Sequence, residues 1–133
     1  MSQENVDLAR KSFAAIQRGD FAFAQELLAP DAVIVQPPEV PDAKTYEGPE
    51  AIRLGWEDWP SQWEDFRIEL VDVIDVDDDT LISVTRQRGR GRDSGIAMDF
   101  EVFFVTHGRD GLIARMEMFF SRAQALKAVG LEE

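Results

Sequence analysis

The alternation of apolar and polar residues is clearest over residues 112–120, which read LIARMEMFF. Side chains of a strand point alternately to its two faces, so this segment predicts a strand with two unlike faces. One face is half charged because it holds Arg115 and Glu117. The other face is wholly apolar and consists of Leu112, Ala114, Met116, Met118 and Phe120. What this apolar face is turned toward therefore decides whether the protein is an enzyme.

Three further segments with strand character precede residues 112–120. The turns between them are short and rich in Asp and Gly. Short turns between long strands predict antiparallel neighbours. The predicted strands span residues 66–76, 80–92, 96–106 and 112–120, with turns at 77–79, 93–95 and 108–111.

The first part of the chain has helical periodicity. Apolar residues at helical spacing predict a helix over residues 5–18. Asp20 can cap a second helix over residues 21–29, which stops before Pro30. A short strand is expected at residues 32–36.

A third helix is predicted after a long proline-rich loop. The loop, residues 37–48, is long for a compact domain and is a candidate lid or mouth of a cavity. Pro49 suits the first helical position, and Pro60 is expected to break or kink the helix near Trp59. One face of this segment carries large apolar residues that are more typical of a core than of a ligand site. They are Ile52, Trp56, Trp59 and Trp63.

The chain closes with a predicted helix over residues 121–129. Ser121 and Gln124 have the spacing of a capping box, and Gly130 suits the C-terminal stop. Helices segregated from an antiparallel sheet are typical of the α+β class. We expect one domain over residues 1–133, in which a curved, mixed but mainly antiparallel sheet wraps around the N-terminal helices as a cone-shaped half-barrel and leaves a cavity.

Charge complementarity predicts which face of the sheet lines that cavity. Arg86 and Arg88 would lie opposite Asp99 and Glu101 if the charged faces of neighbouring strands coincide. Each exposed pair of this kind is worth up to about 1 kcal/mol. The apolar face would then pack on the helices and line the cavity. The charged face would be convex, and either exposed or buried in a homodimer.

Composition narrows the function classes. The net charge is −12, from 14 basic and 26 acidic residues, which argues against nucleic acids and anionic membranes as partners. The sequence has no cysteine, so disulfides and thiolate chemistry are excluded. No apolar run reaches the roughly 20 residues of a membrane helix, and the N-terminus lacks the pattern of a signal peptide. We therefore expect a cytoplasmic protein.

Several motifs together resemble the SnoaL-like group of the nuclear transport factor 2-like superfamily, which has the cystatin-like α+β cone and includes ketosteroid isomerases, polyketide cyclases and epoxide hydrolases. The resemblance covers nearly the whole chain and implies this fold, whereas the chemistry depends on the residues of the cavity. The matching segments are Asn5-Val6, Gly19-Asp20, residues 46–52, 90–95 and 109–111, and Phe120 with Arg122, Ala123, Ala125 and Leu126.

The same resemblance implies that the catalytic positions of the family are replaced in this chain. The aspartate on the last strand of the hydrolases and cyclases falls on Met118. The hydrolases' arginine and second aspartate fall approximately on Thr85 and Gln87, and the isomerases' tyrosine falls near Phe13. None of these four side chains can exchange a proton near neutral pH.

Other candidate groups have competing interpretations. Glu117 would reach the cavity only if a bulge turned it inward. His107 is interpreted as a surface histidine, because a metal site needs partners that the sequence lacks. The acidic cluster at residues 72–79 fits no calcium loop and is interpreted as a solvated turn. The arginines at 86, 88, 90 and 92 either bind an anion or, as we favour, pair with Asp99, Glu101 and a partner subunit.

The favoured hypothesis is a SnoaL-like protein that binds a small hydrophobic molecule, without cofactor, metal or identified catalytic residue. The alternative is an isomerase, polyketide cyclase or epoxide hydrolase that works by acid–base catalysis through Glu117, Asp99 or Glu101. The Tyr46 hydroxyl could bond either a ligand or the backbone. The predicted ligand-binding residues are Phe13, Tyr46, Trp56, Trp59, Thr85, Gln87, Phe100, Val102, Met116 and Met118.

Overall fold

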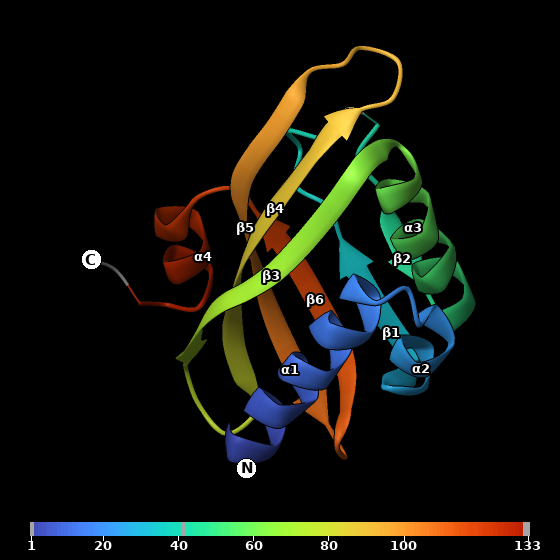
Figure 1. Cartoon of the computed structure of the whole chain (residues 1–133). Helices are drawn as coiled ribbons and strands as arrows, with labels where there is room; N and C mark the ends of the chain where they lie inside the picture. Colours follow the sequence, from blue (N-terminus) through green and yellow to red (C-terminus); the bar gives the residue numbers. More distant parts are fainter. Residues whose placement is uncertain (1, 41, 132–133) are drawn as a thin grey trace.

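The computed structural model describes residues 2–40 and 42–131, which form helices on both sides of one curved sheet (Figure 1). No helix among these residues has the length and apolar character that crossing a membrane requires. The helices are α1 (Ser2–Gln17), α2 (Phe21–Glu26), α3 (Pro49–Ser61) and α4 (Arg122–Ala128). The strands are β1 (Leu28–Val35), β2 (Thr45–Glu47), β3 (Trp63–Asp75), β4 (Thr80–Gly91), β5 (Ala97–Arg109) and β6 (Leu112–Phe119).

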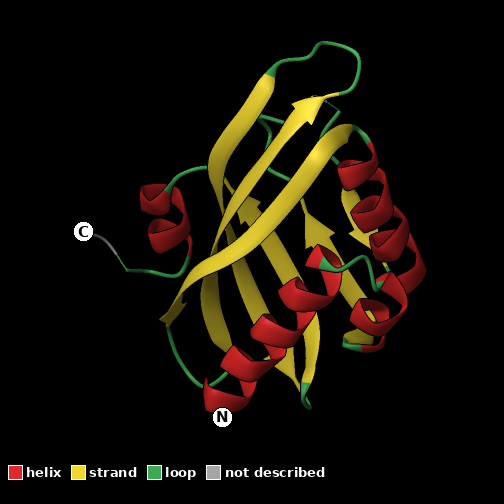
Figure 2. Ribbon diagram, viewed as in Figure 1, coloured by secondary structure: helices red, strands yellow, loops and turns green. Residues whose placement is uncertain are grey.

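The sheet has the strand order β2-β1-β6-β5-β4-β3. β1 and β6 run parallel, and every other neighbouring pair is antiparallel. The sheet is therefore mixed and open, and it curves around the helices α1, α2 and α3, while α4 lies on its other side (Figure 2). This arrangement confirms the predicted α+β class with a curved, mainly antiparallel sheet.

Two predicted helix caps are present. The Asp20 carboxylate accepts a hydrogen bond from the backbone N–H of Phe23 at 3.2 Å. The Ser121 hydroxyl accepts one from the backbone N–H of Gln124 at 3.1 Å. Each bond satisfies a donor that the first turn of a helix leaves free, so these short local signals place the starts of α2 and α4 correctly.

The segments around the prolines differ from the prediction. The helix α2 ends at Glu26, and β1 begins at Leu28, because this part of the chain pairs with Ile113 of β6. The loop at 37–48 contains the short strand β2, which pairs with β1. The helix α3 continues past Pro60 to Ser61, and Trp63 belongs to β3 rather than to the helical stripe.

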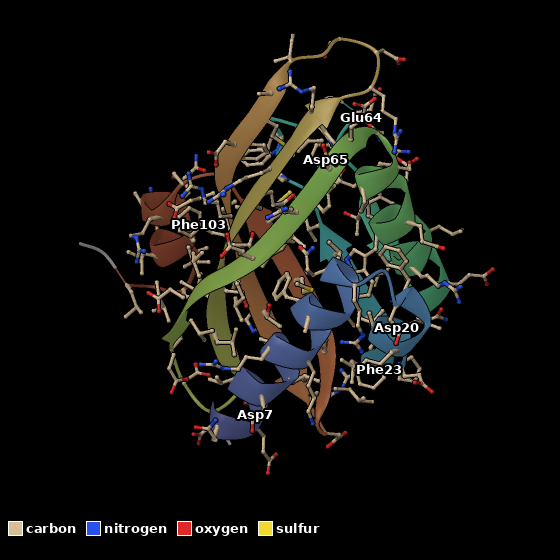
Figure 3. The ribbon with its side chains drawn as sticks, viewed as in Figure 1. Asp7, Asp20, Phe23, Glu64, Asp65 and Phe103 are labelled. Atoms are coloured by element: carbon tan, nitrogen blue, oxygen red, sulfur yellow. The ribbon has the colours of Figure 1, made fainter. Side chains whose placement is uncertain are left out.

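The strand β3 bends at two register shifts. One lies between Glu64 and Arg67, where Asp65 adopts a φ of 53°, and the other lies between Leu70 and Asp72. Figure 3 labels Glu64 and Asp65 near the start of β3. An extra residue in one strand of a pair bends that strand and increases its twist. These bulges let the long edge strand β3 follow the curvature of the sheet.

The two faces of the sheet have separate cores. On the concave face, Phe13 of α1 packs against Phe104 of β5 with ring centroids 5.6 Å apart. On the convex face, α4 buries a second apolar cluster around Phe103 and Leu126. The prediction of a charged convex face is therefore incomplete, since the chain's own last helix covers an apolar part of it. The buried convex residues are Ile82, Val84, Phe103, Val105, Ala125 and Leu126.

Candidate functional site

The strand register brings the apolar residues together on the concave face. Tyr46 of β2 lies opposite Ile34 of β1, which in turn lies opposite Met116 of β6. Gln87 of β4 lies opposite Phe100 of β5. Residues opposite one another across a sheet share a face. The register therefore builds one continuous wall from five strands, β2, β1, β6, β5 and β4.

This wall bounds a cavity of about 580 Å³, which α1, α3 and the loop before β2 complete. A volume of this size is typical of a small-molecule site. Of the sequence-predicted residues, all except Thr85 line the cavity. They are Phe13, Tyr46, Trp56, Trp59, Gln87, Phe100, Val102, Met116 and Met118.

Thr85 lies on the same face but does not line the cavity. Its side chain is fully buried, and its hydroxyl donates a hydrogen bond to the Val102 carbonyl at 2.9 Å. The alternation of side chains along β4 correctly predicted the face on which this residue lies. Its hydroxyl nevertheless bonds the neighbouring strand β5 and lies away from the cavity.

Gln87 and Trp59 join opposite walls of the cavity. The indole N–H of Trp59 in α3 donates to Gln87 Oε1 of β4 at 2.9 Å. Gln87 is only 4% exposed, whereas Trp59 is 38% exposed. An indole N–H is a donor only, so the amide oxygen must face it. The bond therefore sets the orientation of Gln87, the one buried polar side chain among the described residues of the cavity wall.

Tyr46 owes its position to a glycine in α3. A Cβ atom added to Gly55 would lie 3.1 Å from Tyr46 Cε1. Glycine inside a helix costs roughly 1 kcal/mol relative to alanine. Here the missing side chain leaves room for the tyrosine ring, which lines the cavity and is half-buried.

The mouth of the cavity carries charged residues that the sequence analysis did not select. Glu39, Asp42 and Lys44 come from the loop before β2, and Asp58 comes from α3. Asp58 also accepts a hydrogen bond from Gln62 Nε2 at 3.0 Å. The length of the loop at 37–48 predicts a lid or mouth, whereas the folded structure shows which side chains of this loop and of α3 line the cavity.

The three carboxylates of the acid–base alternative lie outside this cavity. Asp99 accepts two hydrogen bonds from Arg86, each 2.8 Å long, which lower the pKa of its carboxyl group. Glu117 pairs with Arg115 of its own strand at 3.3 Å. Glu101 lies beside a separate, open hollow on the convex side. A general acid or base must reach the reacting group, so none of these three can act in the main cavity.

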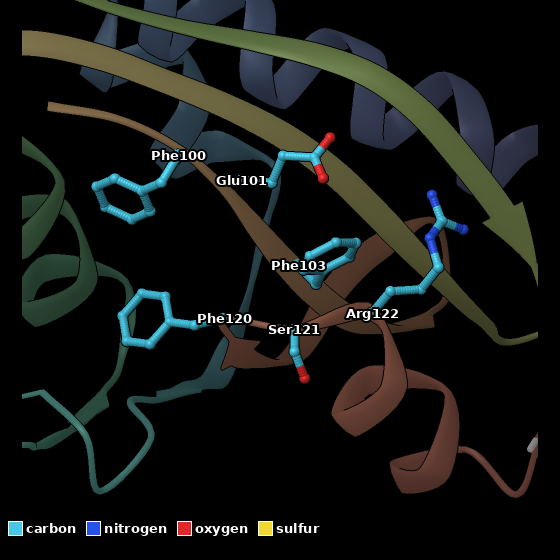
Figure 4. A pocket seen from close by; sticks show the side chains of 6 residues that line it. All are labelled: Phe100, Glu101, Phe103, Phe120, Ser121 and Arg122. Carbon is cyan, nitrogen blue, oxygen red and sulfur yellow. The ribbon is translucent and has the colours of Figure 1, made fainter.

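The convex hollow lies between β5 and the start of α4 (Figure 4). Phe100 and Phe120 line both this hollow and the main cavity, and their rings meet edge to face at 5.9 Å. These two rings therefore form a thin partition at the rim of the sheet. The hollow is lined by Phe100, Glu101, Phe103, Phe120, Ser121 and Arg122.

The remaining candidate groups form no further site. His107 Nδ1 lies 3.0 Å from the Thr80 hydroxyl at one end of the sheet. Arg88 pairs with Asp99, as expected for the arginine face of β4, and also with Glu69 of β3. Arg90 and Arg92 donate to backbone carbonyls. Within residues 2–40 and 42–131, no three His, Asp or Glu side chains converge as a metal site would require.

The chain belongs to the SnoaL-like domain family, whose pattern it matches over residues 9–116. No curated protein matches the sequence significantly. The family and the fold together confirm the resemblance that the sequence motifs indicated.

Solved structures with the same fold are distant in sequence. Bal32a, from a soil-derived mobile gene cassette, is 21% identical with a TM-score of 0.81, covering 96% of this chain and 97% of that chain. TerC, co-crystallised with polyporic acid, is 18% identical with a TM-score of 0.77, covering 95% and 98%. A protein classed as a SnoaL-like polyketide cyclase, from Jannaschia sp. CCS1, is 16% identical with a TM-score of 0.77, covering 99% and 95%. At this identity the likeness shows the fold alone.

Proposed function

We propose that this protein binds a small, mostly apolar molecule in the cavity on the concave face of its sheet. The observation that carries the proposal is the composition of the cavity wall. Its deep part is aromatic and aliphatic, and Gln87 is the buried polar side chain within it. Apolar walls with a few placed polar groups are typical of small-molecule sites.

The solved neighbours support a small-molecule role. TerC was crystallised with polyporic acid, and a protein from Catenulispora acidiphila with the ketosteroid isomerase-like fold was crystallised with trimethylamine. The acid–base alternative receives no comparable support, because Asp99, Glu101 and Glu117 lie outside the main cavity. Binding is therefore the function that the geometry supports best.

The proposal is tested by titrating the protein with the neutral fluorescent probe N-phenyl-1-naphthylamine. We expect saturable binding with enhanced probe emission. The Met118→Trp variant should abolish it, because the larger side chain fills space inside the cavity. Phe119→Trp is the matched control, since it places an indole on the opposite face of the same strand. Circular dichroism must show that both variants fold.

Two outcomes would contradict the proposal. One is the absence of saturable binding to the folded wild-type protein. The other is equal loss of binding in Met118→Trp and Phe119→Trp, which would place the probe elsewhere.

We also propose that the protein is cytoplasmic and forms a homodimer through the convex face of the sheet. The exposed Arg86–Asp99 pair offers polar groups for such an interface.

A further inference from the structure

We propose that Trp59 is a positioning residue that locks Gln87 as a hydrogen-bond donor, so that the cavity selects neutral ligands carrying an acceptor oxygen. This inference rests on the proposed function and specifies the ligand for the same site. It begins from the 2.9 Å bond between Trp59 Nε1 and Gln87 Oε1.

The amide of Gln87 has two unlike ends. Its oxygen is occupied by the indole N–H, which cannot accept a bond and so cannot pair with the amide nitrogen. Among the described residues no acceptor bonds Nε2, and Nε2 is not one of the completely buried side-chain atoms that lack a partner, so it keeps some exposure to the cavity. Because Gln87 is 96% buried and lines the cavity, this N–H₂ group is the free polar end inside an apolar wall.

A donor that faces the cavity without a protein partner favours a ligand that supplies one. A ligand that displaces water from Nε2 without replacing its hydrogen bond loses more than a typical hydrogen bond gains. A carbonyl or ether oxygen held against Nε2 would satisfy it. A ligand whose only polar group is a donor could reach only the second lone pair of Oε1, because Trp59 already bonds this atom.

The charges of the lining disfavour an anionic ligand. Three carboxylates, Glu39, Asp42 and Asp58, stand at the mouth, and Lys44 is the only basic side chain among the described lining residues. This excess of negative charge opposes the entry of anions. The aromatic rings of the wall, including Phe13, Trp56 and Phe100, suit a flat ring system.

Three ring compounds of nearly the same shape test the proposal. Fluorene has no polar group, 9-fluorenone carries an acceptor oxygen, and carbazole carries only a donor. By calorimetric titration, we expect the wild-type protein to bind 9-fluorenone about 3- to 10-fold more tightly than fluorene, the value of one neutral hydrogen bond. Carbazole should gain less affinity over fluorene than 9-fluorenone does, because its N–H must share Oε1 with Trp59.

Two variants separate recognition from positioning. Gln87→Met keeps the length of the side chain but removes the donor, so the preference for 9-fluorenone should fall to about one. Trp59→Phe keeps an aromatic ring but releases Gln87 Oε1, so the amide can rotate and carbazole should gain affinity relative to fluorene. A merely structural role of Trp59 would weaken all three compounds equally.

Gln124→Met is the matched control. Gln124 is exposed in α4 and does not line the cavity. The preference for 9-fluorenone should therefore be unchanged in this variant.

Equal binding of 9-fluorenone and fluorene by the wild-type protein would overturn this inference and leave the proposed function standing. A preference that persists in Gln87→Met would also overturn it. Failure of all three compounds to bind would overturn the proposed function and this inference together.

Discussion

Gly55 of α3 faces the ring of Tyr46, and a Cβ atom at this glycine would lie 3.1 Å from Tyr46 Cε1. This pair joins the helix α3 to the short strand β2 at the wall of the cavity. A side chain at residue 55 must therefore displace the tyrosine ring by a few tenths of an ångström.

Gly55→Ala should affect ligand binding more than stability. Alanine gains roughly 1 kcal/mol of helix propensity, and the close contact with Tyr46 opposes that gain. We expect the free energy of unfolding in urea to change by less than about 1 kcal/mol. The affinity for 9-fluorenone should fall, because the displaced ring changes the cavity wall. Unchanged affinity would show that the position of the Tyr46 ring does not matter for binding.

Ile52→Ala should destabilise the protein strongly. Ile52 is 1% exposed and belongs to the concave core. Removing a buried isoleucine side chain costs about 2–5 kcal/mol, because transfer free energy is lost and a cavity is left. Urea denaturation measures the change. Leu54→Ala in the same helix is the control, since Leu54 is 61% exposed and its loss should change stability by less than about 0.5 kcal/mol.

The Arg86–Asp99 pair should make stability depend on pH in acid. Two hydrogen bonds from Arg86 lower the pKa of Asp99 in the folded protein. The stabilising contribution is therefore present above the ordinary aspartate pKa and is lost as the pH falls through the lowered folded value.

Asp99→Asn tests this dependence. The difference in unfolding free energy between wild type and variant should be larger near neutral pH than in acid, and high salt should reduce it because the pair is exposed. Arg67→Gln removes a charge from the neighbouring strand without touching this pair and serves as the comparison. A difference independent of pH would contradict the prediction.

Homodimerisation predicts a mass of about twice the 15.0 kDa of the chain by size exclusion with light scattering. If the convex face forms the interface, Glu101→Arg should weaken the dimer, because it breaks the alternation of charge with Arg86. Glu50→Arg, on the exposed start of α3 away from this face, should leave the dimer intact. A monomeric wild-type protein at micromolar concentration would contradict the prediction.

The sequence by itself determined the fold class and which face of the sheet lines the cavity. Period-two alternation places Met116 and Met118 on one face of β6 and Glu117 on the other, and backbone geometry alone enforces this division. The helix caps at Asp20 and Ser121 could also be predicted from the sequence, because each capping hydrogen bond joins residues only three positions apart. These features depend on near neighbours in the chain.

Tertiary structure alone decided which polar groups meet in the cavity. The amide of Gln87 is oriented by Trp59, which is 28 residues away in the sequence. Asp58 lines the mouth of the cavity from α3, a position that the apolar stripe of this helix does not predict. Thr85 lies on the predicted face, yet its hydroxyl bonds the Val102 carbonyl. Hydrogen bonds and packing between distant segments set these positions, and no local pattern encodes them.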